Sequence, residues 1–302
     1  MAELLSGKAV AEALTERMKT DVAALKAKGV TPTLGIIRVG EKGPDISYEK
    51  GATKRCEEVG AAVKNYVLPE DATQEALLKT IAEANADRKV HGVLLFRPLP
   101  KHIDDNAARA ALNPAKDVDG ITDGSMAGIY SDSGAGYPPC TAESVIRILD
   151  HYKIDPAGKR VAVLGRSTVI GKPVSLLLLK KNGTVTICHS KTQNLEETVK
   201  AADIAVVAMG RALSVGKEYF RAGQYVIDVG VNPKPNGEKG TCGDVKFDEA
   251  EPVVAGISPV PGGVGAVTNA CLVRPYLSAK RGSVSRALPV RVTLGTETAL
   301  RT

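Results

Sequence analysis

The sequence predicts an α/β protein of two lobes, each containing a doubly wound and largely parallel sheet. Helix-like and strand-like segments alternate along the chain, which is the pattern of βαβ units. The length of 302 residues is about twice that of a typical domain. A short apolar strand at Val161–Leu164 runs through a glycine turn into a helix, which is typical of a Rossmann-type lobe.

The first lobe is expected to comprise residues 1–140 together with 268–280. An amphipathic helix at 3–28 is expected to end at Gly29, where the sequence offers a glycine cap. The apolar alternation and the breaker residues then predict further strands and helices. These are a strand at Thr33–Val39, a helix at Ile46–Val59, a strand at Ala61–Val67, a helix at Thr73–Ala84 and a strand at Gly92–Phe96.

The Rossmann-type lobe is expected to comprise residues 141–267, followed by a helix at Thr268–Ser278 that returns to the first lobe. Residues 281–302 have neither helical periodicity nor a cap, so we expect a loose tail there. The elements predicted within the lobe are helices at Ala142–His151 and Gly171–Lys181 and strands at Val161–Leu164, Val185–Cys188, Ile204–Ala208, Tyr225–Val229 and Val253–Ala255.

The turn after the strand at 161–164 is the first candidate for a binding site. Gly165, Arg166 and Ser167 precede a helix that begins at Gly171. Free N–H groups at a helix N-terminus and in such a turn bind a pyrophosphate. The spacing is G-x-S-x-x-x-G rather than the common G-x-G-x-x-G. Alone it is a moderate signal, because a strand–glycine–helix junction is often only a connection.

The end of the next strand indicates which dinucleotide binds. NAD sites place an acidic residue here for the ribose 2′-hydroxyl, whereas NADP sites replace it with groups that accept a phosphate. Cys188 runs into His189, Ser190 and Lys191 without an acid. We therefore favour NADP over NAD, with Arg166, Ser190 and Lys191 converging on the 2′-phosphate. The alternative is that these are ordinary polar loop residues.

Composition excludes several classes of protein. No apolar run approaches the roughly 20 residues that span a membrane, and the start MAELLSGK lacks the basic region of a signal peptide, so we expect a cytoplasmic protein. Five widely spaced cysteines without a C-x-x-C pair suggest neither disulfides nor a metal site. The net charge of +6 is spread along a chain with 4% aromatic residues, which favours an anionic small molecule over nucleic acid.

Three dense loops fall where strands are expected to end, which is where open α/β sheets bind ligands. Each loop read alone fits plain turn chemistry equally well. They are Pro98-Leu99-Pro100, Lys116-Asp117-Val118-Asp119-Gly120 and Pro259-Val260-Pro261-Gly262-Gly263-Val264-Gly265.

Together with the nucleotide turn, these loops resemble those of the methylenetetrahydrofolate dehydrogenase/cyclohydrolase family over residues 3–280. Further matching motifs are V-G-E at Val39, Ser47-Tyr48, P-C-T at Pro139, C-H-S-K-T at Cys188, D-V-G-V-N at Asp228 and G-D-V at Gly243. The resemblance implies oxidation of 5,10-methylenetetrahydrofolate with NADP, usually followed by hydrolysis of the methenyl product to 10-formyltetrahydrofolate. It also implies a folate-binding catalytic first lobe and a homodimer joined through the nucleotide lobes.

The resemblance also implies roles for single residues. Tyr48 would stack near the folate and Asp119 would bind its pterin ring, and both are the catalytic candidates; without the resemblance they fit a half-buried helix tyrosine and a turn aspartate. Two sets complete the site. Pro98, Leu99, Pro100, Pro261, Gly262, Gly263 and Val264 would shape the folate pocket, and Gly165, Arg166, Ser167, His189, Ser190 and Val231 would hold the dinucleotide.

Two positions depart from the family pattern. The family places a lysine four residues after the tyrosine, where it serves proton transfer in the hydrolysis, and this chain has Ala52. A glutamine that supports this lysine corresponds to Phe96. Lys50 and Lys54 lie about 200° around the helix from Ala52. Arg55 returns to the tyrosine face, but a guanidinium is a poor proton shuttle.

We therefore predict an NADP-dependent dehydrogenase whose cyclohydrolase activity is weak or absent. The alternative is a bifunctional enzyme in which another group or a water replaces the lysine. A more remote alternative is an inactive folate- or nucleotide-binding protein. An unrelated hydroxy-acid or amino-acid dehydrogenase is disfavoured, because His91, His102 and His151 fall outside the proposed site loops and such enzymes generally need a His or Lys beside the reacting oxygen.

Overall fold

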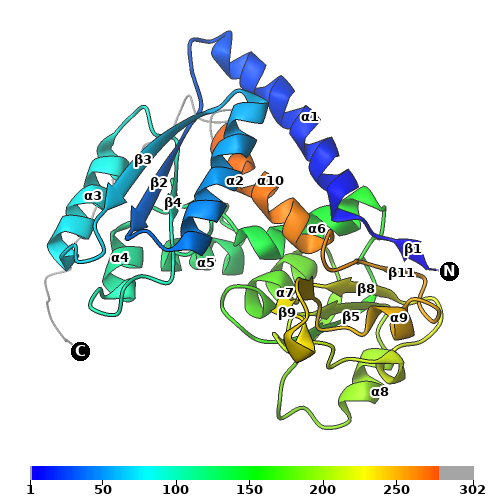
Figure 1. Ribbon diagram of the computed structural model, residues 1–302. Coiled ribbons are helices and arrows are strands. Elements are labelled where there is room, and N and C mark those ends of the chain that lie inside the picture. The colour runs from blue at the N-terminus through cyan, green and yellow to red at the C-terminus, as the bar shows by residue number, and fades with distance from the viewer. Residues whose placement is uncertain (1, 279–302) are drawn as a thin grey trace, which may run out of the picture.

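Two parallel sheets form separate lobes, and long helices lie between them (Figure 1). The structure is a computed structural model and describes residues 2–278. The predicted tail at 281–302 lies outside these residues. The α/β class and the Rossmann-type second lobe are confirmed.

The first lobe contains a three-stranded parallel sheet in the order β3-β2-β4. The central strand is almost wholly buried because helices and loops cover both of its faces. Thr73 caps α3, Asp104 caps α4 and Thr122 caps α5, each through its side-chain oxygen. The elements are β2 (Thr33–Val39), α2 (Gly43–Val59), β3 (Ala62–Leu68), α3 (Gln74–Ala86), β4 (Gly92–Leu95), α4 (Asp105–Ala111) and α5 (Asp123–Tyr130).

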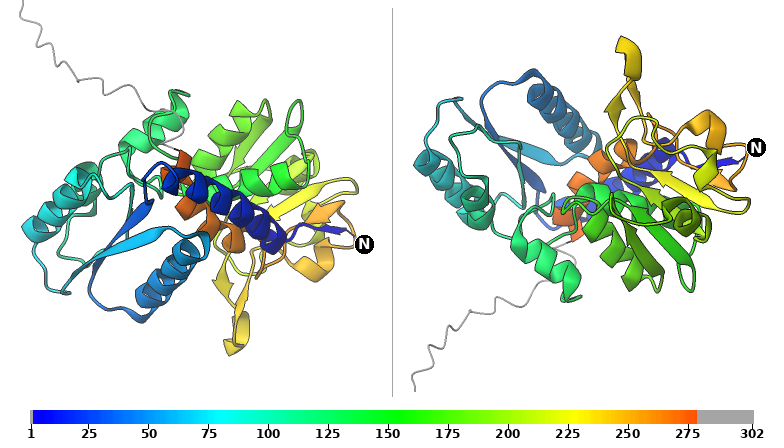
Figure 2. Two further views of the ribbon diagram at one scale, coloured as in Figure 1. Left: turned by 90° about the horizontal axis from the view of Figure 1, so that it is seen from above. Right: turned by 90° about the horizontal axis from the view of Figure 1, so that it is seen from below.

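The second lobe contains a six-stranded parallel sheet in the order β1-β11-β8-β7-β5-β6. A small antiparallel hairpin of β9 and β10 projects from this lobe (Figure 2). The helices are α6 (Cys140–His151), α7 (Gly171–Lys180), α8 (Leu195–Lys200) and α9 (Phe247–Ala250). The strands are β1 (Glu3–Leu4), β5 (Arg160–Leu164), β6 (Thr184–Cys188), β7 (Ile204–Val207), β8 (Tyr225–Asp228), β9 (Asn232–Pro233), β10 (Thr241–Cys242) and β11 (Gly256–Ile257).

Two predictions in the second sheet and its neighbourhood are wrong. The first helix, α1, spans Gly7–Lys26, and residues 3 and 4 form a strand that pairs with β11. This pairing joins residues some 250 positions apart, so local periodicity cannot reveal it. The strand predicted at Val253–Ala255 is instead a turn after α9, and the ladder begins at Gly256. The apolar side chain of Val254 is buried there without strand pairing.

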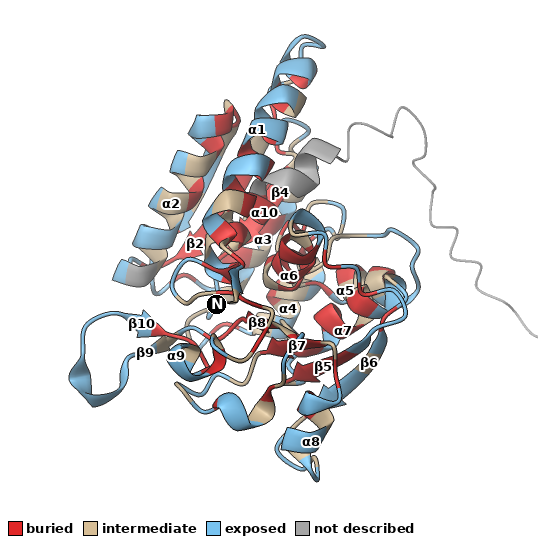
Figure 3. Cartoon of the chain, turned by 90° about the vertical axis from the view of Figure 1, so that its right-hand side faces the viewer, coloured by how far each residue is buried: buried red, intermediate tan, exposed pale blue. Residues whose placement is uncertain are grey.

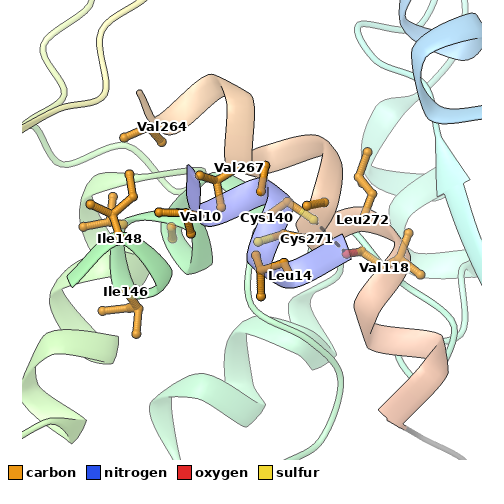
Figure 4. Close-up of a cluster of buried hydrophobic side chains, with 14 of the residues drawn as sticks. Val10, Leu14, Val118, Cys140, Ile146, Ile148, Val264, Val267, Cys271 and Leu272 are labelled. Atoms are coloured by element: carbon orange, nitrogen blue, oxygen red, sulfur yellow. Dashed lines mark hydrogen bonds between the residues drawn. The ribbon is translucent and has the colours of Figure 1, made fainter. Parts of the chain in front are cut away.

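Helices α1, α6 and α10 (Val264–Ser278) pack against one another between the lobes (Figure 4). Val10 and Leu14 of α1 meet Val267 and Cys271 of α10 in one buried cluster. Helix α10 also contacts α2 and β4, so the return to the first lobe is as predicted. It begins at Val264, four residues earlier than predicted.

The strands differ in how far they are buried (Figure 3). Strands β4 and β7 are buried throughout, whereas β6 at the edge of its sheet is largely exposed. All five cysteines are buried. Within residues 2–278, no helix is both long and apolar enough to cross a bilayer, and no cluster of three metal-ligating side chains is present.

Candidate active site

The nucleotide turn lies where the strand order of the six-stranded sheet reverses. From β5 the chain passes through α7 to β6 on one side, and then through α8 to β7 on the other side. In open α/β sheets the crevice beyond the carboxyl ends of such strands binds ligands. Gly165 follows β5 and Ala208 follows β7, so both flank this crevice.

Glycine is required at both ends of the turn. A Cβ on Gly165, whose φ is +129°, would lie 2.2 Å from the carbonyl oxygen of Ala208. A Cβ on Gly171 would lie 2.2 Å from the carbonyl oxygen of Gly165. Ser167 Oγ accepts a hydrogen bond from the N–H of Ile170 at 3.1 Å. The turn therefore closes tightly over the start of α7, with backbone near enough to meet a phosphate.

A cavity of about 520 Å³ opens beside this turn. The residues that line it include no aspartate or glutamate, and they come from the ends of β5, β6 and β7 and from the segments that follow β6 and β7. The lining residues are Leu164, Gly165, Arg166, Ser167, Cys188, His189, Ser190, Thr192, Leu195, Ala208, Met209, Arg211, Ser214 and Tyr219. An acid-free lining with two arginines suits a polyanion such as a dinucleotide phosphate.

Five of the residues predicted to bind the dinucleotide line this cavity: Gly165, Arg166, Ser167, His189 and Ser190. Gly171 does not line it, and packs against the backbone of the turn instead. Lys191 is exposed and is not among the lining residues. The wall formed by Met209, Arg211, Ser214 and Tyr219 was not predicted. The sequence signal for it is weak, because these residues follow β7 without a recognisable phosphate motif.

Two buried aspartates shape that unpredicted wall. Asp244 accepts hydrogen bonds from the N–H groups of Met209, Gly210 and Arg211 at 2.6, 2.9 and 2.7 Å. Asp228 in turn accepts from the N–H of Asp244 at 3.2 Å. Burial raises the pKa of Asp228 to about 6, against the opposing effect of its backbone hydrogen bonds. The aspartates of the D-V-G and G-D-V motifs therefore hold loops in place.

A second cavity, of about 470 Å³, continues from the first toward the other lobe. Ser167, Ala208 and Met209 line both cavities. The second is also lined by Thr141 at the start of α6 and by Val231, whose side chain is largely exposed. A ligand that extends from the nucleotide turn through this cavity would reach the junction of the two lobes.

Tyr48 and Asp119 come together on the other side of that junction. Burial is the main cause that raises the pKa of Tyr48, and the negative charge of Asp119 also raises it because it disfavours the tyrosinate form. The Tyr48 side chain is still 37% exposed. Next to it on α2, Glu49 accepts a hydrogen bond from Arg38 Nε of β2 at 2.7 Å, which fixes this turn of the helix against the sheet.

Asp119 occupies a turn fixed against the edge of β4. Residues 116–118 run beside Val93, with the N–H of Val93 donating to Lys116 at 2.6 Å. Burial, and to a lesser extent Asp117, raises the pKa of Asp119 to about 6, against the opposing effect of hydrogen bonds from Cys140. Asp117 itself is structural, since it accepts from the Ser125 hydroxyl at 2.7 Å and from two backbone N–H groups.

The proline loop after β4 is anchored by its flanking residues. The Arg97–Pro98 peptide bond is cis. Arg97 donates to both carboxylate oxygens of Asp105 at 2.6 Å. Pro98 is exposed, Pro100 is partly buried, and Leu99 packs inward against the first-lobe core. The loop therefore combines an exposed proline with a leucine that packs partly against the core.

The glycine loop before α10 lies against the first turn of α1. The N–H of Gly7 donates to Gly262 at 2.8 Å, and a Cβ on Gly7 would overlap the carbonyl oxygen of Gly263. Pro261 and Gly262 are exposed, whereas Val264 is buried in the central cluster. Val264 still lines the second cavity, so the predicted loop contributes to the lobe junction.

The surroundings of Ala52 agree with the helix register predicted from the sequence. Ala52 is 1% exposed and Phe96 is 6% exposed, both within the central apolar cluster. Lys50 and Lys54 are exposed. Arg55 donates to Thr15 of α1 at 2.8 Å and to Glu58 at 2.9 Å, so its guanidinium is directed away from the tyrosine.

Two sequence models of protein domains match the chain. The catalytic domain of tetrahydrofolate dehydrogenase/cyclohydrolase matches residues 5–119, and its NAD(P)-binding domain matches residues 139–283. The chain belongs to the tetrahydrofolate dehydrogenase/cyclohydrolase family. The predicted family is therefore confirmed.

Curated relatives cover nearly the whole chain. The bifunctional protein FolD of Carboxydothermus hydrogenoformans is 49% identical over 279 residues, which are 92% of this chain and 97% of that protein. The FolD protein of Clostridioides difficile is 42% identical over 92% of this chain and 96% of its own length.

Solved structures of family members superpose closely on this chain. The bifunctional FolD of Campylobacter jejuni gives a TM-score of 0.89 at 35% identity, with 93% of this chain and 99% of that chain covered. The Trypanosoma brucei dehydrogenase–cyclohydrolase, solved with NADP and an inhibitor, gives 0.85 at 35% identity, with coverages of 93% and 98%.

Proposed function

We propose that this chain oxidises 5,10-methylenetetrahydrofolate to 5,10-methenyltetrahydrofolate, with NADP as the hydride acceptor. The observation that carries this proposal is the continuity of the site. The two dinucleotide cavities lead from Arg166 to Thr141. The neighbouring Cys140 contacts Asp119 of the first lobe. A nicotinamide in the second cavity and a pterin at Asp119 would therefore share one junction.

The residues present fit an NADP molecule. The backbone cradle at Gly165 and Gly171 is too tight for a Cβ and lies at a helix N-terminus, as a pyrophosphate requires. The lining residues include Arg166 and Arg211 and no acid that would repel a 2′-phosphate. When bound, NADP supplies the hydride-accepting carbon. We assign its binding to residues 141–267, with His189, Ser190 and Val231 among its contacts.

The first lobe would bind and orient the folate. We assign this role to residues 1–140 together with 268–280. Asp119, ionised above about pH 6, would accept hydrogen bonds from pterin N–H groups. Tyr48 and the loops at Pro98–Pro100 and Pro261–Val264 would hold the ring system so that its methylene carbon faces the second cavity. Such alignment and exclusion of water is the main contribution that a protein makes to hydride transfer.

We further propose that hydrolysis of the methenyl product is weak. The side chains next to Tyr48 at positions 52 and 96 are apolar and buried, so neither moves a proton. Loss of a positioned acid or base typically removes ~10²–10⁴ in rate. The alternative is a bifunctional enzyme, and the names of the relatives, which are called bifunctional, favour it. Under this alternative a water beside Asp119 would replace the missing amine.

A homodimer joined through the nucleotide lobes is a further part of the proposal. Strand β6 lies at the edge of the six-stranded sheet. Ile187 on this strand is 41% exposed, and Leu179 of the adjacent α7 is 59% exposed. An open sheet edge beside exposed apolar side chains suits pairing with a second copy.

A time course with methylenetetrahydrofolate and either NADP or NAD tests the proposal. Methenyl- and 10-formyltetrahydrofolate are followed separately, against the rate of spontaneous hydrolysis. We expect the methenyl product to accumulate with NADP and to decay at the uncatalysed rate. Enzyme-dependent formation of the formyl product would establish the bifunctional alternative. No oxidation with either nucleotide would contradict the proposed dehydrogenase.

A further inference from the structure

A network of two arginines and one aspartate connects two folate loops of the first lobe, namely the proline loop at Pro98–Pro100 and the turn that carries Asp119. Its centre is Asp105, at the first position of α4. Both oxygens of Asp105 accept hydrogen bonds from Arg97, at 2.6 Å each, and Oδ2 also accepts from Arg109 Nε at 3.2 Å. Because Arg97 immediately precedes Pro98, this contact anchors the proline loop to α4.

Arg109 extends the network to the turn that carries Asp119. Its Nη1 donates to the carbonyl oxygen of Ile121 at 3.1 Å and to Asp123 at 3.1 Å. Ile121 also donates its N–H to Asp117 at 3.0 Å, so the end of the turn is held from two sides. A single guanidinium thus contacts both the anchor of the proline loop and the backbone two residues after Asp119.

The β-sheet alone does not fix the spacing of these loops. The proline loop leaves the end of β4, whereas the Asp119 turn is joined to β4 by a single bridge at Val93. Beyond that bridge, the described residues offer Arg109 as the side chain that contacts both Asp105 and the end of the turn. Such planar, multidentate contacts are geometrically specific.

We infer that Asp105 and Arg109 are positioning residues that set the distance between the proline loop and the Asp119 turn, and hence the width of the folate subsite. The inference rests on the proposed function, because it takes these two loops as the walls of that subsite. Neither residue needs to touch the substrate. The side chains of Asp105 and Arg109 are 35% and 23% exposed, and ion pairs that water can reach contribute less to global stability than buried ones. Their loss should therefore affect substrate binding more than folding.

Arg109→Leu is the main test, with Arg109→Lys and Asp105→Asn as graded variants. We expect Arg109→Leu to raise the KM for methylenetetrahydrofolate by ~10–100-fold, since small displacements in a binding site have effects of this order. The KM for NADP should stay unchanged. Arg109→Lys should fall between, because an ammonium cannot reach both Asp105 and Ile121 with the geometry of a guanidinium.

Arg55→Leu is the matched control. Arg55 also joins two segments of the first lobe, and its side chain is 22% exposed, but it contacts neither folate loop. Its removal should leave both KM values unchanged. An unchanged folate KM in Arg109→Leu would overturn the inference. So would an equal rise in the NADP KM, or an equal effect of Arg55→Leu, because either would indicate general loosening.

Calorimetric titration with tetrahydrofolate, without nucleotide, separates this inference from the proposed reaction. If the wild type binds tetrahydrofolate but does not oxidise the methylene form, the proposed reaction is wrong. The ratio of the dissociation constants of Arg109→Leu and the wild type for tetrahydrofolate still tests the network in that case. Weaker binding by Arg109→Leu alone would then support it, and equal binding by wild type and variant would overturn it. A wild type that binds no tetrahydrofolate would overturn both.

Discussion

The ring of Phe96 lies 5.5 Å from the ring of Tyr48, inclined by 54°. Tyr48 and Ala52 are four residues apart in α2 and therefore share a face of that helix. An amine at position 52 would be buried beside the tyrosine, where desolvation lowers the pKa of a lysine toward neutrality. The apolar pair thus occupies the place where a proton-transferring pair would stand.

Ala52→Lys combined with Phe96→Gln should raise the rate of methenyltetrahydrofolate hydrolysis, by ~10²-fold or more, because it restores a positioned acid/base. The dehydrogenase rate should change little. Hydrolysis is measured as the enzyme-dependent loss of the methenyl absorbance. Ala52→Met with Phe96→Leu is the control, since it adds bulk without an amine. A folded Lys/Gln variant that shows no gain would count against this account.

The affinity for folate should depend on pH through Asp119. Its pKa is raised to about 6 by burial, so the carboxylate becomes protonated, and loses its charge, as the pH falls below that value. We expect kcat/KM for the folate to decline below about pH 6. Asp119→Asn should lower kcat/KM at neutral pH and remove this decline. A decline that persists unchanged in the variant would assign it to another group.

Folding stability should show the opposite trend at the same residue. A carboxyl group whose pKa is higher in the folded state than the usual 3.8 binds protons more tightly when folded. Its ionisation therefore costs stability above about pH 6, and this cost disappears below about pH 4. The urea concentration at which half of the protein is unfolded should therefore rise for Asp119→Asn relative to the wild type as the pH increases from 4 to 7. A difference that is constant with pH would contradict this assignment.

Arg166→Ala should weaken binding of NADP much more than binding of NAD. Loss of charged hydrogen bonds to a phosphate is worth about 1.5–3 kcal/mol, which corresponds to a rise in the KM for NADP of ~10–100-fold. Arg160→Ala is the control, because Arg160 lies at the opposite end of the same strand, β5. Equal effects of Arg166→Ala on the two nucleotides would mean that the 2′-phosphate binds elsewhere.

Gly171→Ala should abolish tight dinucleotide binding. The added methyl group would lie 2.2 Å from the carbonyl oxygen of Gly165, so the turn must open, at a cost of about 1–3 kcal/mol in stability. Gly51→Ala is the control, since nothing lies within 4 Å of a Cβ at that helical position. It should leave NADP binding intact and raise the free energy of unfolding by about 0.5–1 kcal/mol. Intact NADP binding by Gly171→Ala would contradict the role of the tight turn.

Local sequence patterns were sufficient for most of the elements and for the residues that act through the backbone. Gly165 and Gly171 could be recognised because only glycine tolerates such close approach of backbone to backbone. Ala52 and Phe96 could be recognised because the motifs around them fix the register in which this chain is compared with the family pattern. In contrast, β1 pairs with a strand at the far end of the chain, and nothing local to Glu3–Leu4 encodes that partner.

The sequence by itself determined the fold class, the family and the nucleotide turn, because short-range geometry and composition suffice for these. Only the tertiary structure decided that Asp228 and Asp244 hold loops, that Arg211 lines the cavity beside the Gly165 turn and that Arg109 connects Asp105 with the end of the Asp119 turn. These roles depend on contacts between segments whose separation along the chain carries no periodic signal. The sequence shows which chemical groups a polar side chain carries, but the packing of the whole fold determines which groups it contacts.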